Sequence, residues 1–270
     1  MVRISKFVIS IVIPFRGNEK ELDFCLNSLI HSKLVKEILV GVDGDESLVE
    51  SLDRSQANFE KITFYFFPNR PGISLILNAL IDLTSGNYVA RMDADDLVIS
   101  ERFELQKRFL DDNPDVDLVA GQAILKKSGE ISKKKVGLLK CSDFLDQNPI
   151  IHPTIMFRRE SPVKGYLVNV YRYNIKYRKS QDYELWTRLV RNWNFYNCKN
   201  AFILYNENYN FTRFFVQHLY FCKAMSKNYF YHLINRKCGC NFFEVLSALP
   251  RVISRLFIYP LKVIILHLLA

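Results

Sequence analysis

The chain has 270 residues, 49% of them hydrophobic, and a formal net charge of +9. This length suits one large or two small domains, and the apolar content is ample for a buried core. A basic surface suits nucleotides, anionic lipid or nucleic acid. The sequence has neither zinc-finger spacing nor an RNA-binding aromatic signature, so we expect no nucleic-acid partner.

The basic residues are unevenly placed along the chain. Residues 121–180 hold thirteen Lys or Arg against four Asp or Glu, and residues 216–270 hold seven against one. The six cysteines are scattered, and Cys238-Gly239-Cys240 lacks the spacing of a zinc site. Polar residues interrupt the N-terminal apolar run at once. We therefore expect a reduced, cytoplasmic setting without a signal peptide.

The N-terminal segment is expected to alternate strand and helix. A β-branched run over residues 8–13 predicts a buried strand, which Pro14 ends. A helix is expected over about residues 19–32, and a second strand over residues 37–42 stops at Asp43. This order predicts a parallel sheet with a right-handed crossover. The helix should bury one face, formed by Leu22, Cys25, Leu26 and Leu29.

The next segment predicts a helix over residues 47–56, a strand over 62–67 and a helix over 74–83. The last helix follows a Pro-Gly turn. Arg70 in that turn suits phosphate oxygens, and it reads equally well as a solvated turn residue. Asn78 is expected to orient neighbouring backbone rather than to contact a ligand.

Residues 87–96, N-Y-V-A-R-M-D-A-D-D, place three carboxylates directly after a short apolar strand. These are Asp93, Asp95 and Asp96. Clustered carboxylates repel one another, and a buried one needs a partner. A hard divalent cation, Mg²⁺ or Mn²⁺, is the usual partner, and such sites lie at the carboxyl ends of strands. A surface turn with solvated aspartates has the same spacing, so spacing alone leaves both interpretations open.

Beyond the acids we expect a helix over residues 101–111, ended by Asn113-Pro114, and a strand over residues 116–119. The lysine-rich segment 126–140 is either a solvated face or a surface toward an anionic membrane or an acceptor. His152 follows the apolar pair Ile150-Ile151, and a structural histidine is one interpretation of it. The Tyr- and Arg-rich residues 165–179 suit sugar stacking or ordinary loops.

Asp182 stands in the first turn of a helix marked by Leu185, Trp186 and Leu189. The helix dipole stabilises an acid there, whether the acid caps the helix or takes part in catalysis. One or two strands follow over residues 193–205. Residues 252–270 are nearly all apolar but contain Arg and Lys. This predicts an interfacial helix with snorkelling basic side chains, or else a helix packed against the preceding part of the chain.

Several segments in order, from about residue 8 to residue 205, resemble glycosyltransferase family 2. They are I-S-I-V-I-P-F, E-I-L-V-G-V-D-G, V-A-R-M-D-A-D-D-L with S-E-R-F-E-L-Q-K-R-F-L, H-P-T-I-M-F-R, and Q-D-Y-E-L-W. The resemblance implies an α/β GT-A fold, Rossmann-like, with a mostly parallel central sheet flanked by helices. The catalytic domain would span residues 1–215, with a nucleotide-sugar half to about 120 and an acceptor half after it. Residues 216–270 would form a helical, apolar, membrane-associated tail.

The resemblance also implies roles for individual residues. Pro14, Asp43, Arg70 and Asp93 would bind the donor, with Asp43 on the base, usually uracil. Asp95, with Asp93 and Asp96, would hold the divalent metal. Asp182 would be the catalytic base, and His152 would face the acceptor. The sequence departs from the family pattern at Val42 and Gln181, where acids are common.

The implied activity is metal-dependent, inverting transfer of one sugar from a nucleotide-diphosphate sugar, with UDP favoured. The Q-x-x-R-W sequence of processive synthases is absent. A lipid-linked saccharide in surface polysaccharide synthesis would be the acceptor, at the inner face of the cell membrane. The alternatives are a nucleotidyltransferase, which normally has a Gly-rich phosphate loop, and a non-catalytic membrane-bound scaffold, which would have lost the acids.

Overall fold

The computed structural model describes residues 8–44, 60–99, 101–206, 211–234 and 242–258. The helix expected over residues 47–56 lies outside these ranges. The chain forms two compact units, each built from separate segments. The first is Met1–Leu138, Ile150–Tyr173 and Asn194–Glu207, and the second is Leu139–Pro149, Asn174–Trp193 and Asn208–Ala270.

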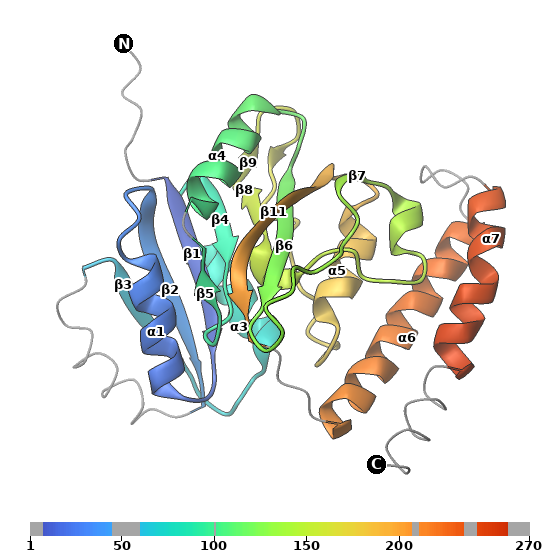
Figure 1. The fold of residues 1–270 in the computed structure, drawn as a ribbon, viewed down its shortest axis with the longest axis horizontal. Coiled ribbons are helices and arrows are strands. Elements are labelled where there is room, and N and C mark those ends of the chain that lie inside the picture. Colours follow the sequence, from blue (N-terminus) through green and yellow to red (C-terminus); the bar gives the residue numbers. More distant parts are fainter. Residues whose placement is uncertain (1–7, 45–59, 100, 207–210, 235–241, 259–270) are drawn as a thin grey trace. The chain divides into compact units, whose positions relative to one another are not determined.

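The first unit is built on one sheet with the strand order β3-β2-β1-β4-β8-β6-β11-β5, and β7 pairs with β11 beside this path (Figure 1). β9 (Glu160–Ser161) and β10 (Gly165–Tyr166) form a separate two-stranded hairpin. The strands of the main sheet are β1 (Ile9–Phe15), β2 (Val35–Asp43), β3 (Ile62–Phe67), β4 (Tyr88–Arg91), β5 (Leu97–Val98), β6 (Leu118–Leu125), β7 (Gly137–Leu139), β8 (Met156–Arg158) and β11 (Phe195–Tyr205).

The N-terminal half of this sheet is parallel, as predicted. β1 pairs with β2 and β4, and β2 pairs with β3, all in parallel. β1 is almost fully buried, which explains its continuous run of β-branched residues rather than an alternating pattern. Because the strands are parallel, their carboxyl ends meet at one edge of the sheet, and Asp43 and the acids after β4 lie there.

The second half of the sheet is mixed, because β8 runs antiparallel to both of its neighbours. It lies between β4 and β6, while β11 runs parallel to β6 and antiparallel to β5. The sequence analysis assigned no strand to the segment that forms β8, since three residues give no readable periodicity. β6 is also longer than the strand expected over residues 116–119.

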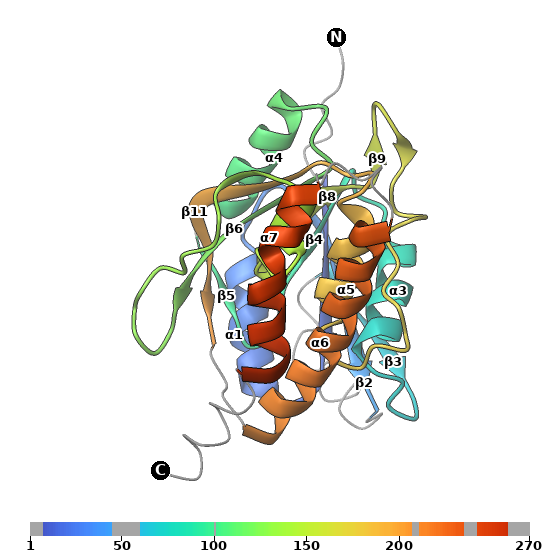
Figure 2. The ribbon, with the colours of Figure 1, turned by 90° about the vertical axis from the view of Figure 1, so that its right-hand side faces the viewer.

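Within the described ranges, three helices cover the sheet of this unit, and Figure 2 shows α1 and α3 on opposite sides of it. α1 buries the predicted face, and the Asn18 side chain caps it by accepting from the backbone N–H of Lys20 at 3.0 Å. α1 ends three residues earlier than predicted. The bounds are α1 (Glu19–Leu29), α3 (Ile73–Leu83) and α4 (Arg102–Asp112).

Gly41 allows α3 to approach β2 closely. A Cβ at this position would lie 2.3 Å from Ile76 Cγ2 and 3.2 Å from Leu80 Cδ1. Since Ile76 is buried and branched, it has little room to move. We expect Gly41→Ala to lower the free energy of unfolding by about 1–3 kcal/mol in urea titration. In the double variant with Ile76→Ala, the loss should be smaller than the sum of the two single losses; additive losses would contradict this packing.

The second unit is helical. It consists of the 3₁₀ helix η1 (Cys141–Phe144), α5 (Gln181–Leu189), α6 (Phe211–Ile234), α7 (Phe242–Ile253) and a π-helical turn (Ser254–Ile258). The carbonyl of Phe144 ties three elements together. It accepts from the Tyr183 hydroxyl at 2.5 Å and from Asn228 Nδ2 at 3.0 Å. Arg251 on α7 pairs with Asp146 at 3.1 Å.

The C-terminal helix begins well before residue 252, where the sequence analysis placed the start of an apolar helix. The described part of that expected helix is the end of α7 and the π-helical turn, and residues 259–270 lie outside the described ranges. Among the helices that the structure describes, none combines the length and the apolar character that crossing a bilayer requires.

Candidate active site

Three carboxylates meet at the carboxyl end of β4. Asp93, Asp95 and Asp96 each place one oxygen within 4.8 Å of the others. The N–H of Asp96 donates to the carbonyl of Asp93 at 3.3 Å, which closes a tight turn before β5. This turn folds three adjacent acids into one group, so the predicted clustering is confirmed.

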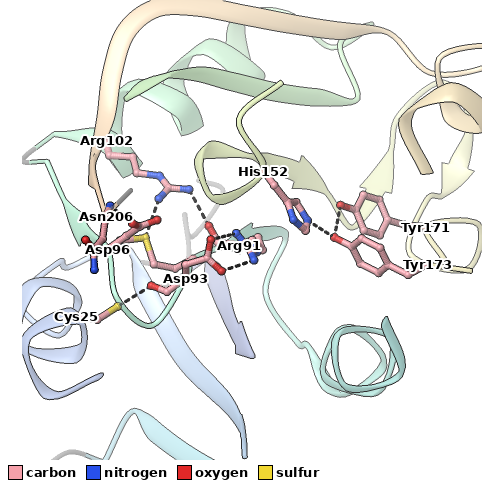
Figure 3. A network of polar contacts seen from close by, with 10 residues as sticks. Cys25, Arg91, Asp93, Asp96, Arg102, His152, Tyr171, Tyr173 and Asn206 are labelled. Atoms are coloured by element: carbon pink, nitrogen blue, oxygen red, sulfur yellow. Dashed lines mark hydrogen bonds and ion pairs between the residues drawn. The ribbon is translucent and has the colours of Figure 1, made fainter. Parts of the chain in front are cut away.

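Asp93 is held by a buried arginine from the end of β4. Arg91 Nη1 donates to Asp93 Oδ2 at 2.7 Å, and Nη2 donates to Oδ1, so the pair is bidentate (Figure 3). The Arg91 side chain is only 4% exposed, and bidentate geometry fixes the plane of the carboxylate. Asp93 is therefore held in a fixed orientation before any ligand arrives.

Asp96 is fully buried, and only one of its oxygens has a partner. Oδ1 accepts from the backbone N–H of Asn206 at 2.9 Å, while Oδ2 has none among the described residues. Asn206 Nδ2 also reaches Asp95 Oδ2 at 3.5 Å. Burial and the Asp93 carboxylate raise the pKa of Asp96 to about 8, and burial raises the pKa of Asp95.

Three clustered carboxylates, one of them with a buried oxygen that accepts no hydrogen bond from the described residues, fit a bound divalent cation. A buried carboxylate oxygen without a donor costs free energy unless a proton or a cation occupies it. The group supplies only oxygen atoms, the donors that Mg²⁺ and Mn²⁺ prefer. Asp95 and Asp96 are the best-placed ligands, because both Asp93 oxygens already accept from Arg91.

Arg102 and Cys25 support the turn from behind. Arg102 is 1% exposed, and its Nη2 donates to the carbonyls of Arg91 at 3.1 Å and Ile155 at 3.2 Å. The Cys25 thiol donates to the carbonyl of Asp93 at 3.4 Å. Burial lowers the pKa of Arg102 to about 9, so its charge beside Asp96 is retained at neutral pH.

Asp43 lies at the carboxyl end of β2, two strands from the acid group. Its side chain is 9% exposed; Oδ2 lies 3.8 Å from Arg16 Nη1, and the buried Oδ1 has no partner in the described part of the chain. The stem of Arg70 lies against Gly44, where a Cβ would be 2.4 Å from Arg70 Cγ. Pro14 lies opposite Gly41 near the end of β1. The fold thus brings these three predicted donor residues to the edge of the sheet that also carries Asp93.

His152 begins a short 3₁₀ helix and is buried. Its Nε2 lies 2.6 Å from the Tyr173 hydroxyl, which in turn lies 3.0 Å from the Tyr171 hydroxyl. Asn78 holds this segment: Nδ2 donates to the Tyr173 carbonyl at 2.9 Å, and Oδ1 accepts from the Tyr173 N–H at 2.8 Å. The predicted backbone-orienting role of Asn78 is confirmed, and its target is remote in sequence.

The His152 side chain should make the protein sensitive to acid. Burial and the nearby Arg91 charge hold the pKa of His152 well below 6.5. Below about pH 6.5 the unfolded chain binds a proton that the folded chain does not. The free energy of unfolding should then fall by up to about 1.4 kcal/mol per pH unit until the folded pKa is reached. His152→Gln should reduce that slope in denaturant titrations between pH 7 and about pH 5; an unchanged slope would contradict this account.

Asp182 lies in the second unit, in the first turn of α5, as predicted. Its Oδ2 accepts from Asn148 Nδ2 at 2.9 Å, and the side chain is partly exposed. The preceding Ser180 has φ +51°, and its hydroxyl donates to the Gln217 carbonyl at 3.0 Å. These contacts fix the start of α5, and the Asp182 side chain there is half-buried.

Sequence reasoning missed Asn206 and Asn148 and did not single out Arg91. Arg91 could have been identified from the sequence, because it stands two positions before Asp93, and side chains two positions apart on an extended chain point to the same face. Asn206 and Asn148 carry no local signal. Each is joined to its aspartate by a contact between segments distant in sequence.

Comparisons with known proteins agree with this geometry. The chain is 29% identical over 192 residues to the amylovoran biosynthesis glycosyltransferase AmsE of Erwinia amylovora, covering 67% of this chain and 69% of that protein. It is 24% identical over 192 residues to the O-antigen biosynthesis glycosyltransferase WbnJ of Escherichia coli, covering 68% and 72%.

A solved structure shares the fold at low sequence identity. The crystal structure of S. aureus TarS 1-349 superposes with a TM-score of 0.68 at 14% identity, covering 93% of this chain and 72% of that one. Its complex with UDP-GlcNAc gives a TM-score of 0.62. The family described as Glycosyl transferase family 2 matches residues 10–177, a stretch that includes Asp43, the acid group and His152. Since this match covers more than half of the chain and the acids lie at the strand ends of a GT-A sheet, the chain belongs to glycosyltransferase family 2.

Proposed function

We propose that this glycosyltransferase moves one sugar from a UDP-sugar to a hydroxyl acceptor, with inversion and with the help of a divalent metal. The observation that carries the proposal is the buried Oδ2 of Asp96, which has no hydrogen-bond partner among the residues that the structure describes, within the group of three carboxylates. An arrangement this costly in the free protein is stabilised when a cation and a nucleotide diphosphate bind.

Asp95 and Asp96 would hold Mg²⁺ or Mn²⁺, with Asp93 as a further ligand or as the group that orients ribose. The metal would supply positive charge to the diphosphate leaving group. Arg91 holds the Asp93 carboxylate in a fixed plane. The N–H of Asn206 and the charge of Arg102 stabilise ionised Asp96.

The donor base would lie against Asp43. Its buried Oδ1 accepts no hydrogen bond from the described residues, and the N3–H of uracil would donate one. The TarS complex with UDP-GlcNAc supports UDP as the carrier. Arg70, packed against Gly44, would neutralise part of the diphosphate charge, and Pro14 would line the base side of the pocket.

Asp182 would act as the general base. Its Oδ2 is oriented by Asn148, and its exposure leaves it able to accept a proton from the acceptor hydroxyl. The deprotonated acceptor oxygen would then attack the anomeric carbon on the face opposite the diphosphate. This single displacement would invert the configuration at that carbon. His152 would line the acceptor side through its contact with Tyr173.

A lipid-linked saccharide in surface polysaccharide synthesis is the proposed acceptor. The relatives AmsE and WbnJ are named for the biosynthesis of amylovoran and O-antigen. We further propose that residues 1–215 form the catalytic domain and that residues 252–270 contact the inner face of the cell membrane. Arg255 in the π-helical turn lies among apolar residues, as expected for a snorkelling side chain.

Titration calorimetry tests the donor site directly. The purified chain is titrated with UDP, GDP and CDP, each with and without Mn²⁺. We expect binding of UDP that requires the metal, because the carboxylates repel a bare diphosphate. If the protein bound only GDP or only CDP, the donor base would be guanine or cytosine rather than uracil. Absence of binding to all three by a folded protein would refute the proposed activity.

A further inference from the structure

The segment that follows β6 and runs into β7, residues 126–138, is an exposed strap of unusual composition. It holds five lysines, Lys126, Lys127, Lys133, Lys134 and Lys135, and one acid, Glu130. Three branched aliphatic side chains on it are also exposed: Ile131 at 54%, Val136 at 49% and Leu138 at 53%. Figure 2 shows this strap as a green loop that extends away from the sheet.

Buried amide side chains fix the backbone of the strap. Gln122, 3% exposed, accepts from the Lys134 N–H at 2.9 Å and donates to the Lys134 carbonyl at 3.1 Å. Asn197, fully buried, donates to the Lys135 carbonyl at 2.7 Å. Ser132 donates to Gln122 Oε1 at 2.9 Å and accepts from the Ala123 N–H at 2.9 Å.

These contacts determine which side chains face outward. With the backbone at Ser132 and Lys134 bonded to the sheet, Ile131, Lys133 and Lys135 lie exposed on either side of the anchored positions. The exposed aliphatic groups are therefore held in place on an ordered segment rather than on a random coil. Keeping three of them in water is unfavourable unless they have a partner.

The strap leaves the sheet at the edge that carries the acids. The N–H of Lys126 donates to the Tyr205 carbonyl at 2.9 Å, and the next residue, Asn206, binds Asp96. From that edge the strap runs back along β6, with Ile131 opposite Ile124 and Lys134 bonded to Gln122.

We infer that the strap docks on an anionic lipid surface. Lysines complement phosphate headgroups, and branched aliphatics enter the apolar layer beneath them. A soluble polyanion satisfies the lysines but gives the aliphatic side chains no apolar environment, so lipid accounts for both features. The inference rests on the proposed function only for its setting, since it adds a second lipid contact to the one proposed for residues 252–270.

Vesicle co-sedimentation of the full chain tests the strap. Phosphatidylcholine vesicles with and without phosphatidylglycerol are compared. Wild type should bind only the anionic vesicles, more weakly at high salt. Lys133→Gln with Lys135→Gln should weaken binding about 25-fold, at about five-fold per lysine. Ile131→Ser with Leu138→Ser should weaken it about ten-fold, as expected for losing two half-buried aliphatic groups.

Matched controls come from the same unit. Lys33→Gln with Lys36→Gln removes two exposed lysines before and at the start of β2, and Val163→Ser removes an aliphatic side chain that is 69% exposed. Both should bind vesicles as wild type does. Thermal melts confirm that every variant folds, and UDP calorimetry on the same samples reports the donor site separately.

Two results would overturn the inference. One is wild-type affinity in both strap variants, with all binding lost on deletion of residues 252–270. The other is absence of binding to anionic vesicles together with binding to inorganic polyphosphate that the lysine variant loses, which would identify an anionic-polymer site instead.

Discussion

Asp182→Asn should reduce the rate of sugar transfer by about 10²–10⁴-fold while UDP affinity stays within about two-fold of wild type. The side-chain amide of the variant has the size of the carboxylate, and its oxygen can still accept a hydrogen bond from Asn148 Nδ2. It cannot take a proton from the acceptor hydroxyl. The measurement is kcat from a donor-consumption assay, paired with UDP calorimetry on the same preparation.

Asn148→Ala separates the base from its support. Removing the Nδ2 donor leaves the Asp182 carboxylate in place but less well oriented, so we expect a smaller loss in kcat than for Asp182→Asn. Near-wild-type turnover by Asp182→Asn would show that another group removes the proton. A loss of UDP binding in that variant would show that Asp182 belongs to the donor site instead.

Asp95→Ala should abolish the metal-dependent part of UDP binding, a loss of at least about 100-fold in affinity. Asp95 is half-buried, whereas both Asp93 oxygens accept from Arg91 and Asp96 is fully buried, so we expect Asp95 to be a principal metal ligand. Calorimetry with and without Mn²⁺ measures the loss, and direct Mn²⁺ titration followed by electron paramagnetic resonance measures the ion itself.

Glu21→Gln is the matched control for this change. Glu21 lies in the first turn of α1, and its charge contributes to the raised pKa of Asp95 without belonging to the ligand group. It should retain metal-dependent binding. If Asp95→Ala bound UDP and Mn²⁺ as wild type does, Asp93 and Asp96 alone would hold the metal.

Family membership also bears on the alternatives raised by the sequence. A nucleotidyltransferase shares an acidic metal site, but the match over residues 10–177 is to glycosyltransferases. A scaffold without activity would have lost its acids, and here all three are packed into one group with their supporting bonds intact.

Local pattern was sufficient for much of the fold and for half of the site. The β-branched run of β1, the apolar face of α1 and the acids after β4 are each encoded within a few residues, because burial and strand ends impose short-range patterns. The parallel order of the first strands then places Asp43 and Asp93 at one edge of the sheet. Those residues could be named from the sequence alone.

Contacts between distant segments were decided only by the tertiary structure. Three residues of β8 enter the sheet antiparallel because β4 and β6 leave a strand position between them, not because of any periodicity of their own. Asn206 reaches Asp96 because β11 pairs with β5, and Asn148 reaches Asp182 across a span of 34 residues. A sequence names side chains able to donate a hydrogen bond, but only the folded chain determines which carboxylate each one reaches.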